Sequence, residues 1–273
     1  MCGGMRGIMY LAFFKMKFLT GLQYRAAAAA GMATQFVWGI FEILLYKAFY
    51  ETNASAFPMD FQALASYIWL QQAFLSLYFV WVFEGDIFQT ITSGSVVYEL
   101  CRPMDLYTMW FSRSIANRIS KAVLRCLPVL LFASILKRPY GISLPASIHA
   151  AFWFFVSFFL ALFTVVAFTM LIYISAFYTI QTDGIKTLAA GLVEFLSGAT
   201  IPLPFLPDSV RTVVEMLPFA SMQNVPFRIY GGDLSGNEMY EKIALQLFWI
   251  LVMVAVGKWL TSHALRRIVV QGG

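Results

Sequence analysis

Two acidic residues lie inside long apolar stretches of the sequence, where an ionisable side chain is unusual. Glu42 lies in the stretch at about 26–50, and Glu194 lies near the middle of the stretch at about 185–205. A charged group within a segment that crosses a bilayer is costly, and it commonly faces a polar path or a neighbouring helix. We therefore predict Glu42 and Glu194 as candidates for a translocation path, with packing between helices as the alternative for each.

The sequence lacks the motifs of catalysis and of nucleotide binding. No His-Glu-x-x-His, Gly-x-Ser-x-Gly or Gly-x-x-x-x-Gly-Lys-[Ser/Thr] pattern occurs. The two histidines, His149 and His263, are expected at opposite ends of their spans, so they cannot share a metal or a catalytic dyad. The cysteines Cys2, Cys101 and Cys126 have no metal-ligand spacing. We therefore expect no enzyme, no metal site and no cofactor bound by this chain.

The composition makes a lipid bilayer the solvent of this chain. Of its 273 residues, 60% are hydrophobic and 12% are charged, against about 45–50% apolar and about 25% charged in soluble domains. The apolar stretches are long and continuous, which favours helices over the short alternating strands of a membrane barrel. We predict an all-α membrane protein with a single domain over residues 1–273. The net charge of +5 reflects basic residues near span ends, so no nucleic-acid partner is expected.

Six stretches approach the roughly 20 apolar residues that a helix needs to cross a bilayer. They lie at about 26–50, 61–83, 116–136, 147–178, 185–205 and 241–262. With the N-terminus inside, twelve basic residues fall on the cytoplasmic side and five on the outer side, which satisfies the positive-inside rule. We therefore predict a multi-pass protein of the plasma membrane with both termini in the cytoplasm and the first span retained.

Residues 5–24 precede the first span and mix basic with apolar side chains. Arg6, Lys15 and Lys17 interrupt this segment too often for it to cross the bilayer. An interfacial helix lying along the cytoplasmic leaflet accounts for the mixture. A packed lead-in to the first span is the alternative.

The longest cytoplasmic connection covers residues 84–105 and contains a short helical pattern that ends at a glycine. A short surface helix can seat in a groove of a soluble partner and carry its motion into the spans. We predict such a docking helix here, although a solvated loop helix would have the same pattern. The residues predicted for this contact are Asp86, Ile87, Ile91, Gly94, Leu100, Arg102 and Pro103.

The stretch at 199–226 is apolar but is broken by prolines. Each proline removes a backbone donor and clashes with the preceding turn, so the stretch cannot form one helix. We predict a re-entrant outer hairpin with a short helix at about 208–217, capped by Asp208 or Ser209. An ordinary proline-rich external loop is the alternative. The residues predicted to form this outer gate are Gly198, Pro202, Pro204, Pro207, Pro218, Phe219 and Pro226.

Together the two segments resemble the membrane subunits of type-2 ATP-binding cassette (ABC) exporters, particularly the small six-span permeases of prokaryotes. In the first segment the likeness rests on Asp86-Ile-(x)6-Gly94 and Leu100-x-Arg102-Pro103. In the second it rests on Leu196-Ser-Gly-Ala-x-Ile-Pro-Leu-x-Phe-Leu-Pro207 and Leu217-Pro-Phe219. The likeness covers nearly the whole chain.

The resemblance implies a permease that moves an amphipathic or hydrophobic solute outward across the bacterial inner membrane. It implies a dimer of six-span subunits, identical or different, with two separate ABC ATP-binding subunits that hold ATP and Mg. Residues of about 86–100 then correspond to the coupling helix, and those of about 199–226 to a hairpin that closes the path to the exterior. A non-catalytic membrane scaffold and an ion-driven secondary transporter are the alternatives, the latter weakened because only one half of the chain carries a proline-rich break.

Overall fold

A computed structural model describes residues 2–23, 25–81, 83–179 and 181–266, with the side chains of residues 2–6, 25–30 and 56 also outside the description. Cys2, Arg6 and Arg25 therefore lie outside the described side chains. In the described ranges the chain is all-helical. The α-helices are α1 (Cys2–Gly21), α2 (Arg25–Thr52), α3 (Phe61–Ala73), α4 (Leu75–Tyr78), α5 (Gly85–Thr92), α6 (Val96–Leu100), α7 (Leu106–Ile135), α8 (Ile148–Ser175), α9 (Asp183–Leu196), α10 (Asp208–Met216), α11 (Asn224–Gly231) and α12 (Gly236–Leu265), and the short 3-10 helices are η1 (Ala54–Ala56) and η2 (Leu203–Phe205).

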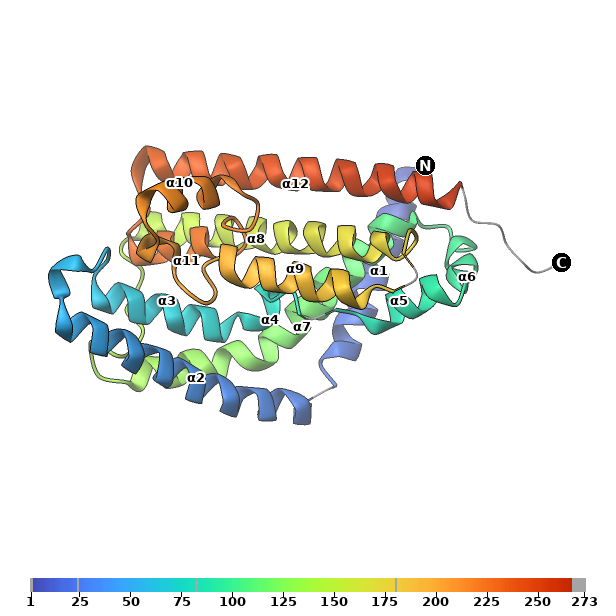
Figure 1. The fold of residues 1–273 in the computed structure, drawn as a ribbon. Coiled ribbons are helices and arrows are strands. Elements are labelled where there is room, and N and C mark those ends of the chain that lie inside the picture. Colours follow the sequence, from blue (N-terminus) through green and yellow to red (C-terminus); the bar gives the residue numbers. More distant parts are fainter. Residues whose placement is uncertain (1, 24, 82, 180, 267–273) are drawn as a thin grey trace.

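The long helices run side by side as an elongated bundle (Figure 1). α8 lies in its interior and contacts α7, α11 and α12. Small and medium apolar side chains such as Ala161, Val165 and Met170 are fully buried along α8, which allows neighbouring helices to approach closely. α12 lies on the outside of the bundle and exposes large apolar side chains, among them Leu251 and Trp259.

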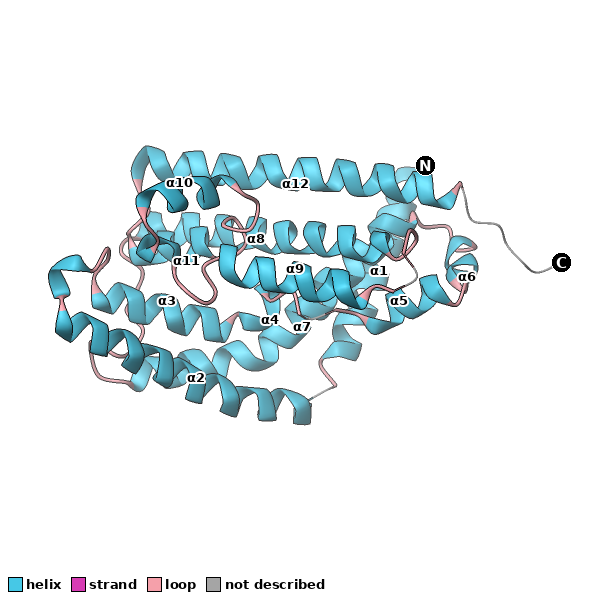
Figure 2. Ribbon diagram, in the orientation of Figure 1, coloured by secondary structure: helices cyan, strands magenta, loops and turns pink. Residues whose placement is uncertain are grey.

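The bundle has two distinct ends (Figures 1 and 2). The α10 end carries α10, α11 and the start of α12. The α5 end carries α5, α6 and the last turns of α12. There α1 crosses the long helices and packs against α7. α1 exposes the apolar side chains of Ile8 and Leu11. It runs at an angle to the long helices (Figure 1), as a helix lying along the membrane surface would.

Within the described residues, α8 and α12 are the two helices that are long and apolar enough to cross a membrane on length and composition. They coincide with the predicted spans at 147–178 and 241–262. The predicted span at 61–83 is instead divided, because α3 ends at Ala73, a short α4 follows, and residues 79–81 are non-helical. The predicted span at 185–205 ends early, since α9 stops at Leu196. Its 14 residues rise roughly 21 Å, against about 30 Å of hydrocarbon. The six-span division stays a prediction.

A buried arginine stabilises the end of α4. A helix end leaves backbone carbonyls without partners, and here Arg118 of α7 donates from one guanidinium nitrogen to the carbonyls of Leu77 and Phe79, both at 2.9 Å. Its other terminal nitrogen donates to the Thr169 hydroxyl of α8 at 3.2 Å. Arg118 is only 2% exposed, so three helices meet at this one side chain.

Replacing this arginine tests the arrangement. Arg118→Met should lower the free energy of unfolding by about 3 kcal/mol or more, because it leaves buried carbonyls without donors. Thermal unfolding of the detergent-solubilised chain measures the effect as a lowered midpoint. Lys121→Met is the matched control, because Lys121 lies one turn further along α7 and makes no hydrogen bond or ion pair within the described part of the chain. Equal midpoints for both variants would contradict the assignment.

Candidate functional site

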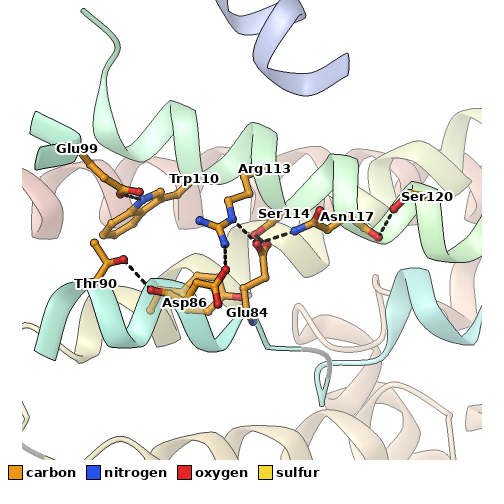
Figure 3. A network of polar contacts seen from close by, with 10 residues as sticks. Glu84, Asp86, Thr90, Glu99, Trp110, Arg113, Ser114, Asn117 and Ser120 are labelled. Carbon is orange, nitrogen blue, oxygen red and sulfur yellow. Dashed lines mark hydrogen bonds and ion pairs between the residues drawn. The ribbon is translucent and has the colours of Figure 1, made fainter. Parts of the chain in front are cut away.

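At the α5 end, a single carboxylate joins the chain after α4 to α7 (Figure 3). Glu84 accepts hydrogen bonds from Arg113 Nε at 2.5 Å, from the Ser114 hydroxyl at 2.9 Å and from the Asn117 amide at 2.6 Å. Asn117 lies four residues after Arg113 and three after Ser114, and such positions are neighbours on a helix surface, so the three donors reach the same carboxylate. The backbone N–H of Glu84 also donates to the Tyr173 hydroxyl of α8 at 2.8 Å.

The Glu84–Arg113 pair is buried, with side chains 10% and 9% exposed. Removing one partner of a buried ion pair costs about 3–5 kcal/mol, because the other charge is left uncompensated. Arg113 also pairs with Asp86 at 2.9 Å, but the Asp86 side chain is 81% exposed, and exposed pairs contribute little. The buried pair therefore holds the start of α5 on α7.

α5 packs its apolar face into the chain's own core. Ile87, Phe88 and Ile91 are buried, so the two isoleucines predicted to seat in a partner's groove face inward instead. The predicted break at Gly94 is confirmed, because α5 ends at Thr92 and Gly94 has a φ of 73°. That left-handed conformation favours glycine.

The exposed surface of this end lies mainly on and after α6. Tyr98 is 79% exposed, and Leu100 is also exposed. Arg102 and Pro103 are exposed in the turn that follows. Glu99 of α6 accepts a hydrogen bond from the Trp110 indole of α7 at 2.5 Å, as Figure 3 shows. Tyr98 could not be predicted as part of this surface, because a single tyrosine has no spacing pattern that marks it in the sequence.

A second contact joins α5 to α9. The Lys186 ammonium of α9 lies 3.9 Å from the centre of the Phe88 ring, within range of a cation–π interaction. α9 then runs toward the segment that contains Gly198. This contact could not be predicted from local sequence patterns, because nearly a hundred residues separate its two partners along the chain.

The segment at 199–226 is held to α3 by hydrogen bonds to its backbone. The Tyr67 hydroxyl donates to the carbonyl of Gly198 at 3.1 Å, and the Gln71 amide donates to the carbonyl of Ala199 at 2.6 Å. Gly198 has a φ of 82°, so a larger residue there would be strained. α9 therefore ends where α3 supplies partners for the following carbonyls.

The prolines of this segment separate short elements, as predicted. Pro202 and Pro207 precede η2 and α10, Pro204 lies within η2, and Pro226 lies in the first turn of α11. Pro218 lies in the turn before Phe219, whose ring packs against Phe168 of α8 at 5.3 Å between ring centres.

The predicted helix at 208–217 is present as α10, but its predicted cap is wrong. Pro207 occupies the N-cap position, and no side chain caps the helix. Asp208 lies in the first turn and pairs with Arg211 at 2.8 Å. Pro207 has no side-chain acceptor for the first N–H groups, and the acidic Asp208 instead complements the positive end of the helix dipole from the first turn.

Beside this segment, four charged residues form a cluster that we call the α10 cluster: Glu215, Arg228, Asp233 and Lys242. Glu215 of α10 accepts from Arg228 of α11 at 2.7 Å and from Lys242 of α12 at 2.5 Å. Arg228 also pairs with Asp233 at 2.5 Å. The cluster therefore connects α10 to α11 and α12 at the α10 end.

Glu42 and Glu194, the two acids predicted from the sequence, line the same cavity. This cavity has a volume of about 540 Å³ and lies among α2, α3, α4, α7 and the end of α9. Glu42 accepts from the Gln72 amide at 3.4 Å, and Glu194 accepts from the Trp81 indole at 3.2 Å. The structure thus brings together two residues that are far apart in the sequence.

These features are those of the membrane subunit of a transport system: long apolar helices, a short helix fixed to one end of the bundle and a cavity with two acids. A profile of the family described as ABC-2 family transporter protein matches residues 36–272. The chain belongs to this family and is therefore an ABC transporter permease subunit, which works with ATP-binding subunits and is not itself the catalytic subunit. No curated protein matches the chain.

The α10 cluster predicts a specific pH dependence. Burial raises the pKa of Glu215, but the hydrogen bond from Lys242 and the charges of Arg228 and Lys242 outweigh it, so the pKa lies below its ordinary value of 4.5. A carboxyl group whose pKa is depressed by folding stabilises the fold above its unfolded pKa, and this contribution is lost as the pH falls through the folded pKa. Glu215→Gln should therefore lower the thermal midpoint at pH 7, and its difference from the wild type should shrink below about pH 4.5.

The measurement is the thermal midpoint of both proteins between neutral pH and about pH 3. Glu241→Gln is the control, because Glu241 is exposed on α12 beside Lys242 and has no ion pair in the described ranges. A difference between wild type and Glu215→Gln that does not change with pH would contradict a charged Glu215 in the cluster.

Proposed function

We propose that this chain is the permease subunit of an ATP-driven exporter that moves an amphipathic or hydrophobic solute across the bacterial inner membrane. It works as a dimer of six-span subunits, identical or different, with separate ATP-binding subunits at its α5 end. The observation that carries this proposal is the fixed attachment of α5 to α7 through the buried Glu84–Arg113 pair. A short helix that receives force from a partner needs such a stiff connection to the spans.

The exposed residues of the α5 end form the contact with the ATP-binding subunit. They are Asp86, Gly94, Tyr98, Leu100, Arg102 and Pro103. Tyrosine and arginine are common anchors of protein interfaces. Ile87 and Ile91, which are buried against the spans, transmit the motion of α5 and do not touch the partner.

Two routes carry this motion toward the α10 end. One runs from Glu84 through Arg113 into α7. The other runs from Phe88 through Lys186 into α9, whose end leads directly to Gly198. The segment at 199–226, entered at Gly198, then opens the outer end of the path. Its gate residues are Gly198 at the entry and Pro202, Pro204, Pro207, Pro218, Phe219 and Pro226 within the segment.

In this function the chain has a defined orientation in the membrane and a defined translocation path. The α5 end faces the cytoplasm, together with α1 as an interfacial helix and both termini. Glu42 and Glu194 line the translocation path, which includes the cavity of about 540 Å³. A helix bundle with a cavity that contains two acids and with one anchored short helix supports a transporter over a scaffold, since a scaffold requires neither feature.

The first test is the recovery of the partner. The tagged wild-type chain, purified in mild detergent from its native host, should bring a stoichiometric ATP-binding subunit, detected by mass spectrometry. The variant Tyr98→Ala, Leu100→Ser, Arg102→Ser should reduce that recovery about tenfold or more, because it removes exposed anchors without touching the buried pair.

The control variant changes two exposed residues of the loop at the α10 end, Arg138→Ser with Leu144→Ser. It should retain the partner fully. A wild-type chain that purifies alone, or a purified single chain that hydrolyses ATP, would contradict the proposal. Equal partner recovery with both variants would place the contact elsewhere.

A further inference from the structure

The two acids of the cavity have no cationic partner within the described part of the chain. Glu42 and Glu194 each accept one hydrogen bond from a neutral side chain, Gln72 and Trp81 respectively. Neither forms an ion pair among the described residues, whereas the buried acids Glu84 and Glu215 do. Acids retained inside a bundle normally pair with one another or with basic groups. The cavity therefore presents two carboxyl groups for which the described residues supply no cationic partner.

A buried glutamine also faces this cavity without a partner. Gln35 of α2 lines the cavity and is only 3% exposed. In the described part of the chain, both its amide nitrogen and its amide oxygen are buried without a hydrogen bond, as is the amide oxygen of Gln71. Most buried side-chain polar atoms have a partner, because leaving one unsatisfied costs about 1–3 kcal/mol. Polar groups of a bound molecule would supply the missing partners.

The remaining walls are apolar and rich in aromatic rings. Trp38, Phe41, Tyr46 and Phe79 line the cavity beside leucine side chains. Aromatic faces attract cations within about 6 Å of the ring centre, more strongly where water is excluded. An apolar wall with a few placed polar groups is the usual composition of a small-molecule site.

The cavity also contains one basic group, and its position separates the charges. Arg125 lines the cavity and has a partner of its own within the chain. Its guanidinium lies against Gly31 of α2, where an added Cβ would be 2.8 Å from it. Glu42 follows eleven residues later on the same helix, roughly 16 Å along its axis. The half of the cavity around Glu42 is therefore negative, and the half around Gly31 is positive.

We propose that the solute moved by this permease is an organic cation, with an apolar or aromatic body held by the aromatic walls and a positive group held by Glu42 and Glu194. Gln35 binds a polar group of the same solute. This inference rests on the proposed transport function and narrows it to a substrate class. The two carboxylates stabilise the positive charge of the solute and replace the water that solvates this charge outside the cavity.

The probe is radiolabelled tetraphenylphosphonium, an organic cation with four aromatic rings, and triphenylphosphine oxide is its uncharged counterpart. Binding is measured by equilibrium dialysis to the full chain in phosphatidylcholine nanodiscs, together with any subunit that co-purifies, and empty nanodiscs give the lipid background. The cation should bind at least about tenfold more tightly than the neutral compound. Glu42→Gln and Glu194→Gln should each weaken cation binding about tenfold and leave the neutral compound unaffected.

Two further variants separate charge from fold. Glu51→Gln is the matched control, because Glu51 lies on α2, pairs with Lys47 at 3.3 Å and does not line this cavity. It should bind the cation as the wild type does. Glu194→Asp, which keeps the charge, should recover part of the binding that Glu194→Gln loses. Unchanged thermal midpoints show that each variant is folded.

Equal binding of the two compounds, or unchanged cation binding in both glutamine variants, would overturn the cationic substrate. This failure is distinct from a failure of the transport function. If an ATP-binding subunit co-purifies but the cation does not bind selectively, the permease function stands and the substrate class is wrong. If no such subunit co-purifies, the transport proposal fails whatever the cation does.

Discussion

The buried pair of Glu84 and Arg113 is the interaction on which the functional geometry depends. It forms between α4 and α5, where the chain leaves the divided segment of α3 and α4. The pair therefore fixes the direction of α5, which has only eight residues. A helix this short has little stability of its own. Its position therefore comes from the charge pair and from the apolar contacts of Ile87 and Ile91, which together make α5 part of the bundle.

α9 connects the two ends of the molecule through a few contacts. Its first turn contacts α5 through Lys186, and its last turn meets the carbonyls that α3 holds through Tyr67 and Gln71. One helix of 14 residues therefore connects α5 with the start of the segment at the α10 end. The α10 cluster fixes the far side of that segment to α12, so the segment lies between two anchored elements.

The sequence predicts the elements that local pattern determines. α8 and α12 follow from continuous apolar runs, the break at Gly94 follows from glycine, and α10 follows from the surrounding prolines. It does not predict where α9 ends, because its apolar run continues past Leu196 and tertiary hydrogen bonds from α3 decide the boundary. It also does not predict that Ile87 and Ile91 face inward, since their spacing defines a face but not what that face contacts.

Glu42 and Glu194 line one cavity, and this position helps to explain why acids occur in these apolar helices. Either acid alone could have a purely structural role between helices. Such a role would require hydrogen-bond or ion-pair partners for both carboxylate oxygens. The structure instead gives each acid one neutral donor within the described residues and places Arg125 toward the other end of the cavity. Packing accounts poorly for two incompletely partnered acids and an unpartnered glutamine at one site. A path that takes up polar or charged groups accounts for all three at once.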